Sequence, residues 1–274
     1  IRNIFMENPN YYGVKDIFQY FKANINFIPV DEKGMRTDMI PAIKNGIVYA
    51  TPSRQFPLGY TMSIDRRLDL LSKAKKQNLI ILEDDFDSDY RYNGEPISSL
   101  QGYDTDERVI YTGTFSKVLY SGIRLGYCIL PEKFLSEFQK LRSTVNQPPS
   151  SLTRSIIADF MRSGKFHKHI RKMHRIYKER KDFMEKEIAR ELGDILDLQL
   201  CSSGLHMHAY FKNEVSRENL KASFKKHKIE IFLLSDYFTG RPEREALIFG
   251  FAAFDEGRSR HAVKILKKAL QESF

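Results

Sequence analysis

Cysteine and long apolar stretches are the two features that this sequence most clearly lacks. The 274 residues include only two cysteines, Cys128 and Cys201, which excludes a disulfide framework and favours a reducing compartment. No apolar run approaches the roughly 18 residues that span a bilayer. The opening IRNIFMENPN also lacks the basic start and apolar stretch of a secretory signal. We therefore expect a cytoplasmic protein without a membrane segment.

Patterns for binding metal or DNA are missing as well. His167, His169 and His174 have no i,i+4 pairing on their helix-like stretch, so we predict no metal site. The net charge of +9 comes without a helix-turn-helix or zinc-finger pattern. Positive charge is concentrated between Lys165 and Lys181, where apolar residues recur at helical spacing. This favours the solvated side of an amphipathic helix over a DNA-binding surface.

The first 130 residues instead alternate strand-like and helix-like segments. Such alternation of apolar strands with helices predicts an α/β domain with a mostly parallel sheet. Ser63 is predicted to cap the second helix. The strand-like runs are 2–6, 25–30, 47–51, 79–82, 108–111 and 125–130, and the helical periodicity covers 14–21 and the stretch after residue 63.

The pattern changes near residue 150. Two helices are predicted at 152–161 and 165–192, followed by strands at 198–201, 205–211, 229–234 and 246–251 and by helices at 216–226 and 261–270. We interpret residues 1–150 as a large domain, 151–192 as connecting helices and 193–274 as a small α+β domain.

An acid, a lysine and an arginine follow the strands of the first domain. Asp84 comes after the strand at 79–82, Lys117 after the strand at 108–111, and Arg124 seven residues later. Parallel sheets bind ligands at the carboxyl ends of their strands. A pyridoxal phosphate site needs a lysine for the Schiff base, a carboxylate for the pyridine nitrogen and an arginine for the phosphate. By spacing alone, however, such a lysine is more often simply exposed on a loop, and an aspartate after a strand is often a helix cap.

Longer sequence motifs surround Asp84, Lys117 and Arg124. Nearly the whole chain resembles the aminotransferase-like domain (fold type I, class I/II) of MocR/GabR regulators, a branch of the GntR transcription-factor family. The motifs that carry this resemblance are ENPNYYG, IPVDEKGM, TPSRQFPLG, EDDFDSDYRYNGEPISSLQ, VIYTGTFSKVL, GIRLGY and GLHMHAYF. The resemblance implies a three-layer sandwich with a mostly parallel sheet, together with a smaller C-terminal domain.

The same resemblance assigns roles at a pyridoxal phosphate site. Lys117 is implied as the Schiff-base lysine and Asp84 as the partner of the pyridine nitrogen. Arg124 is implied as the phosphate ligand, helped by the hydroxyls of Thr114 and Ser116.

At two parts of the site, the family pattern assigns the residues of this chain less directly. The family has an arginine for the effector carboxylate where this chain has Arg244, although Arg241 is close enough to compete, and an exposed loop arginine is the plain alternative. Phe86 replaces the tyrosine whose hydroxyl would bind the cofactor, because a phenyl ring cannot donate. Arg54 and Leu58 stand where histidine and threonine are usual.

The resemblance implies an effector-sensing domain that forms an aldimine with an amino-acid or amine effector, without a need for turnover. It also implies a homodimer that contacts DNA only through a separate N-terminal winged-helix domain. A genuine aminotransferase is the alternative function, and a scaffold that binds no cofactor is a third. Because the chain begins at Ile1, we expect a piece of a longer protein without the family's phosphate-cradling turn and stacking aromatic residue, and therefore weakened cofactor binding.

Overall fold

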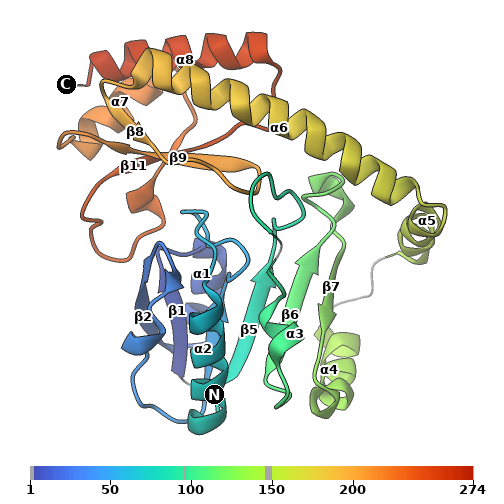
Figure 1. Cartoon of the computed structure of the whole chain (residues 1–274). Helices are drawn as coiled ribbons and strands as arrows, with labels where there is room; N and C mark the ends of the chain where they lie inside the picture. Colours follow the sequence, from blue (N-terminus) through green and yellow to red (C-terminus); the bar gives the residue numbers. More distant parts are fainter. Residues whose placement is uncertain (1–2, 96, 146–149, 274) are drawn as a thin grey trace. The chain divides into compact units, whose positions relative to one another are not determined.

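The computed structural model describes residues 3–95, 97–145 and 150–273, which form two units (Figure 1). Unit 1 comprises residues 1–56, 60–89 and 95–172, and unit 2 comprises 57–59, 90–94 and 173–274. Two short pieces from the first hundred residues therefore belong to the second unit. The predicted limits at residues 150 and 192 stay a prediction. Arg2, where the first strand is predicted to begin, lies outside the described residues.

A seven-stranded sheet forms the centre of unit 1. Its order is β3-β2-β1-β4-β5-β6-β7, and only the β2–β3 and β6–β7 pairs are antiparallel. The predicted α/β class with a mostly parallel sheet is confirmed. The strands are β1 (Asn3–Asn8), β2 (Asn24–Asp31), β3 (Gly34–Met35), β4 (Gly46–Ala50), β5 (Ile80–Asp85), β6 (Val109–Thr114) and β7 (Gly126–Ile129).

Each face of this sheet has its own core, because successive strand residues point to opposite faces. Phe5 belongs to one core, together with Leu70 of α2. Met6 belongs to the other, together with Phe18 of α1. The helices of unit 1 are α1 (Tyr12–Tyr20), α2 (Ile64–Gln77), α3 (Leu100–Tyr103), α4 (Glu132–Val145) and α5 (Ser151–Arg162), and α6 (Lys165–Leu192) runs on into unit 2.

Two details of unit 1 differ from the sequence expectations. Ser63 occupies the N-cap position of α2, but its side chain accepts no capping hydrogen bond. Its backbone is used instead, because its amide donates to the Lys33 carbonyl and its carbonyl accepts from the Arg67 amide. Helix α4 is an element that the patterns above do not predict, and none of its residues is buried.

Arg67 is a fully buried charge in unit 1. Its guanidinium donates to the carbonyls of Pro52 at 2.7 Å, Ser98 at 2.9 Å and Met62 at 3.0 Å. The loop after β4, the segment before α3 and the start of α2 therefore meet on one side chain. Buried polar groups are tolerated when they are hydrogen-bonded in this way.

Unit 2 is built on an antiparallel sheet of order β10-β11-β9-β8. Helices α7 and α8 pack on each other, and the Ser223 hydroxyl donates to the Ala269 carbonyl at 2.7 Å. The elements are β8 (Leu196–Leu198), β9 (His206–Phe211), α7 (Arg217–Lys226), β10 (Phe232–Leu233), β11 (Ala246–Gly250) and α8 (Glu256–Gln271).

Three predicted boundaries in unit 2 are wrong. The strand expected at 198–201 is β8, which ends at Leu198, and the strand expected at 229–234 is the two-residue β10. Helix α8 begins five residues before the predicted start, because the Asp255 side chain accepts a hydrogen bond from the Arg258 amide at 2.9 Å and caps an earlier turn.

Candidate functional site

The strand order of unit 1 reverses between β1 and β4. The chain continues from β1 to β2 on one side and from β4 to β5 on the other, and open α/β sheets bind ligands at the carboxyl ends of strands at such a point. Glu7 of β1 and Thr51, directly after β4, are joined across it. The Glu7 carboxylate accepts from the Thr51 hydroxyl at 2.5 Å and from the Thr51 amide at 3.2 Å. A ligand site is therefore expected at this edge.

Asp84 lies at the same edge, near the end of β5. The Tyr49 hydroxyl, from β4, donates to its Oδ2 atom at 2.6 Å. Burial raises the pKa of the Asp84 carboxyl above its usual value, Asp85 adds to this by repulsion, and the Tyr49 hydrogen bond opposes it. Within the described residues, no donor reaches Oδ1. A cationic N–H group would therefore find a favourable partner in this carboxyl.

Lys117 and Arg124 lie on one closed turn between β6 and β7. Thr114 pairs with Gly126 in the ladder, and the Phe115 amide donates to the Leu125 carbonyl at 3.0 Å. Lys117 is exposed and forms no hydrogen bond or ion pair with a residue that the structure describes. Arg124 is also exposed, in the left-handed region at φ 47°. Both cationic groups are available to a ligand.

The two predicted hydroxyls differ in their availability. The Thr114 hydroxyl accepts from the Ser116 amide at 3.1 Å and lies 3.5 Å from the Leu125 carbonyl, so it helps to shape the turn. The Ser116 hydroxyl has no partner in the described part of the chain. Ser116 is therefore the better candidate for a phosphate donor.

Three aromatic rings are in contact near the Glu7–Thr51 pair. Phe56 packs edge-on against Tyr11 with ring centroids 5.8 Å apart and against Phe86 with centroids 5.7 Å apart. The Phe56 amide donates to the Thr51 hydroxyl at 3.2 Å, which links the rings to the Glu7 carboxylate. Tyr11 is 43% exposed, so part of its ring is free to contact a planar ligand.

Arg54, which stands where histidine is usual in the family, forms an ion pair with Asp87. Its guanidinium lies 3.5 Å from the Asp87 carboxylate, and both side chains are buried. A buried carboxylate needs a paired cation, and the residue next to Phe86 receives one here. Arg54 is therefore part of a buried ion pair in unit 1.

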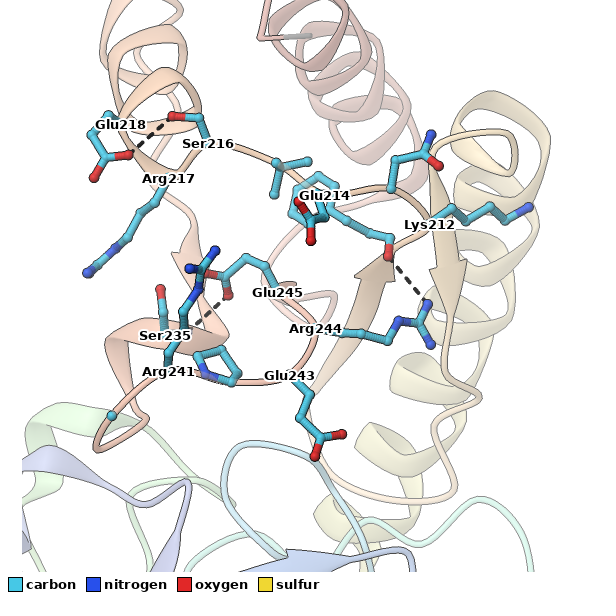
Figure 2. Close-up of a pocket in the computed structure, with 15 residues that line it drawn as sticks. Lys212, Glu214, Ser216, Arg217, Glu218, Ser235, Arg241, Glu243, Arg244 and Glu245 are labelled. Carbon is cyan, nitrogen blue, oxygen red and sulfur yellow. Dashed lines mark hydrogen bonds between the residues drawn. The ribbon is translucent and has the colours of Figure 1, made fainter.

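Arg241 and Arg244, the competing candidates for an effector carboxylate, line one pocket of unit 2 (Figure 2). The pocket has a volume of about 600 Å³. Arg244 points to the Phe211 carbonyl, to which it donates at 3.3 Å, and it also reaches Asp197 at 3.5 Å and stacks on Tyr210. Glutamates line the same pocket, so its charge is mixed. The assignment to Arg244 stays a prediction.

The residues of unit 1 fit pyridoxal phosphate. Asp84 would offer a half-buried carboxylate oxygen to a pyridinium, Lys117 an unpaired amine to the aldehyde, and Arg124 a guanidinium to the phosphate. The ring of Tyr11 supplies an aromatic surface nearby. In the described part of the chain, no group of three His, Cys, Asp or Glu side chains could hold a metal ion.

Sequence reasoning missed Glu7, Tyr11 and Tyr49. Tyr49 lies within a strand, where aromatic residues are common for packing alone, and nothing in its sequence position marks a bond to Asp84. Glu7 and Tyr11 belong to the ENPNYYG motif, which carries part of the family resemblance. The signal for both is that this motif begins at the carboxyl end of the first strand, where α/β sheets bind ligands.

Replacing Glu7 by glutamine is expected to change how stability depends on pH. Burial raises the pKa of Glu7 from 4.5 to about 7. An acid whose pKa is higher in the folded state stabilises the fold fully below the unfolded value, and this contribution is lost as pH rises through the folded value. Between pH 4.5 and 8, Glu7→Gln should therefore gain about 3 kcal/mol in unfolding free energy relative to the parent. Urea unfolding at several pH values measures this, and parallel pH curves for the two proteins would contradict it.

Comparisons with known proteins show which family this sequence is similar to. The sequence pattern of the family described as aminotransferase class I and II matches residues 2–225. The uncharacterized HTH-type transcriptional regulator YdeL of Bacillus subtilis (strain 168) is 35% identical over 263 residues, covering 96% of this chain and 57% of that protein. The probable rhizopine catabolism regulatory protein MocR of Rhizobium meliloti is 31% identical, covering 96% of this chain and 54% of that protein. The chain thus spans little more than half the length of these relatives.

A solved structure shows the same fold. An archaeal alanine:glyoxylate aminotransferase matches with a TM-score of 0.89 and 26% identity, covering 99% of this chain and 70% of that chain. The predicted fold type I architecture is thereby confirmed. Since the family pattern covers most of the sequence and the fold agrees with it, the chain belongs to the aminotransferase class I and II family.

Proposed function

We propose that this chain is the effector-sensing domain of a MocR-type transcriptional regulator and that it binds pyridoxal phosphate at Lys117. The observation that carries the proposal is the free amine of Lys117 on a turn at the same sheet edge as the half-buried Asp84. The two HTH-type relatives that match 96% of the chain support regulation over turnover. The proposal includes a cytoplasmic homodimer that contacts DNA through an HTH region outside this sequence.

Each residue has a distinct task at the proposed site. Pyridoxal phosphate supplies an electron-withdrawing ring whose aldehyde takes up amino groups. The Lys117 amine provides the covalent attachment, and Asp84, held by Tyr49, keeps a proton on the ring nitrogen. Arg124 and Ser116 bind the phosphate, because a guanidinium fork and a hydroxyl match its oxygens. The exposed ring of Tyr11 would offer an aromatic surface to the cofactor.

The effector is proposed to be an amino acid or another amine, because a primary amine can displace Lys117. Arg244 is the proposed ligand for an effector carboxylate. Arg241 is the alternative, and its attraction lowers the pKa of Glu218 in the same pocket, after the hydrogen bonds that the Glu218 carboxyl accepts from its own backbone and from Ser216. An effector that binds two arrangements of the domains with different affinity shifts their populations, and no turnover is required.

A genuine aminotransferase is the second candidate, favoured by the fold match to an archaeal alanine:glyoxylate aminotransferase. In that function Lys117 would also carry a proton to and from the substrate during each cycle. A spectroscopic titration separates the two functions. The purified chain is titrated with pyridoxal phosphate, then with a panel of amines and amino acids in the presence of a 2-oxo acid.

The regulator predicts a saturable absorbance change and no more than about one equivalent of oxo product per site. Continued product formation over many equivalents would establish the enzyme and overturn the regulator. Failure to develop any visible band with pyridoxal phosphate would overturn both and favour a scaffold that binds no cofactor.

Replacing Phe86 by tyrosine is expected to strengthen cofactor binding about tenfold. The new hydroxyl would extend from a ring already packed on Phe56 and could donate to the cofactor's phenolic oxygen. One hydrogen bond to a charged oxygen contributes about 1.5–3 kcal/mol. Affinity measured by absorbance titration checks this, and Phe56→Tyr is the matched control. An unchanged affinity in Phe86→Tyr would show that residue 86 does not face the phenolic oxygen.

A further inference from the structure

Helix α6 contacts the turn that carries Lys117. The His169 Nε2 atom lies 3.0 Å from the carbonyl oxygen of Val118, the residue directly after Lys117. A carbonyl oxygen only accepts hydrogen bonds, so Nε2 must carry the hydrogen and donate. This bond joins residues 51 positions apart in the sequence. The basic stretch that the sequence marks only as an amphipathic helix thus reaches the reactive turn.

The imidazole of His169 is held by aromatic packing. Its ring centroid lies 6.3 Å from that of Phe160, and Phe160 and Phe115 each pack edge-on against Phe166 at 6.1 and 6.2 Å. Phe115 precedes Lys117 by two residues. The same aromatic group therefore supports both the histidine and the approach to Lys117, which limits the directions in which Nε2 can point.

The Lys117 side chain cannot be oriented by its own contacts. It is exposed, and its amine has no partner within the part of the chain that the structure describes. Its position is therefore set through the backbone. Inside the turn, the Leu119 amide donates to the Phe115 carbonyl at 3.0 Å and the Ser116 amide to the Thr114 hydroxyl at 3.1 Å. His169 adds a support from another element, at the peptide that joins Lys117 to Val118.

We propose that His169 is a positioning residue for Lys117, which fixes the Val118 carbonyl and thereby presents the lysine amine to the aldehyde of the cofactor. This inference rests on the proposed function, because it assigns Lys117 as the point of attachment. His169 itself touches neither the amine nor the cofactor. Its contribution is to reduce the conformations that the turn must give up when the lysine reacts.

The matched control is His174 on the same helix. Its Nε2 atom makes the same kind of bond to the Arg91 carbonyl, at 2.7 Å, and its ring packs on Tyr92 with centroids 5.4 Å apart. His169→Phe and His174→Phe each retain an aromatic ring and lose one N–H donor. His169→Gln retains a donor without the ring and tests rescue.

Two measurements on the full chain separate this inference from the proposed function. Amide hydrogen exchange of residues 116–119, without any cofactor, reports the order of the turn. The rate at which added pyridoxal phosphate develops its visible band reports the presentation of Lys117. In His169→Phe we expect about tenfold faster exchange at 116–119 and about tenfold slower band formation, the factor that corresponds to one lost hydrogen bond.

We expect a different result from each variant. His169→Gln should recover most of both effects, and His174→Phe should accelerate exchange at 90–94 while leaving 116–119 and band formation unchanged. Parent-like exchange at 116–119 in His169→Phe would overturn the positioning role, as would equal effects in His174→Phe. If the parent develops no band while His169→Phe still loosens the turn, the assignment of the cofactor fails and the structural support by His169 stands alone.

Discussion

Replacing Lys117 by alanine is expected to abolish the visible absorbance band that pyridoxal phosphate develops on this protein. The variant has no amine on the turn between β6 and β7, so only Asp84, Arg124 and their neighbours remain to hold the cofactor. Losing a covalent link of this kind should weaken retention on the order of 1000-fold, equivalent to about 4 kcal/mol. Dialysis followed by absorbance measurement at the cofactor's visible maximum checks both expectations.

The matched control is Lys44→Ala. Lys44 is also exposed, but it precedes β4 and so lies toward the opposite edge of the sheet from Lys117. This variant should develop the band of the parent protein. A band that persists in Lys117→Ala and disappears in Lys44→Ala or in another lysine variant would show that the attachment site lies elsewhere.

Replacing Arg67 by methionine is expected to lower the free energy of unfolding by about 4 kcal/mol. Methionine fills much of the volume but donates no hydrogen bonds, so the carbonyls of Pro52, Met62 and Ser98 lose their shared donor. An unsatisfied buried carbonyl costs about 1–3 kcal/mol, and partial relaxation of the loops reduces the sum. Burial raises the pKa of the Glu83 carboxyl, and removing the charge also takes away the Arg67 attraction, one of the interactions that oppose this rise.

Chemical denaturation measures this loss, with Lys76→Met as the control. Lys76 lies on the same helix and is exposed, so its replacement should change stability by less than about 0.5 kcal/mol. If Arg67→Met proved as stable as the control, the three carbonyls would have to be satisfied by other donors, and the buried guanidinium would not be what joins these segments.

The sheet was predictable because its signal is local. Strands such as β4 and β5 are short apolar runs between turns, and their parallel arrangement follows from the helices between them. The positions of Asp84 and Lys117 after two such strands then placed both residues at the same edge. Helix α4 has Leu135, Phe138 and Leu141 at helical spacing, but these side chains are exposed, so the helix is not part of the core that apolar periodicity usually indicates.

The contacts that shape the site were not predictable in the same way. The bond from Tyr49 to Asp84 spans 35 residues, and the bond from His169 to Val118 spans 51. Such pairs depend on the register of β4 beside β5 and on the course of α6, which no single segment encodes. The amine of Lys117 has no partner among the described residues, and this also depends on how the turn folds. The sequence therefore predicts which side chains lie at the carboxyl ends of the strands, but it does not predict which residues they bond.

The composition of unit 2 has a consequence for the order in which the chain can fold. The Tyr92 hydroxyl donates to the Gly204 carbonyl across 112 residues, and His206 bonds the Pro57 carbonyl across 149. Closing loops of this length carries a large entropic cost that must be met before these contacts form. A protein dissected at residue 173 would leave 57–59 and 90–94 on the wrong side of the cut. We therefore expect the C-terminal fragment alone to lack a cooperative unfolding transition, and the second unit to complete its structure only after residues 57–59, 90–94 and 173–274 have all been synthesised.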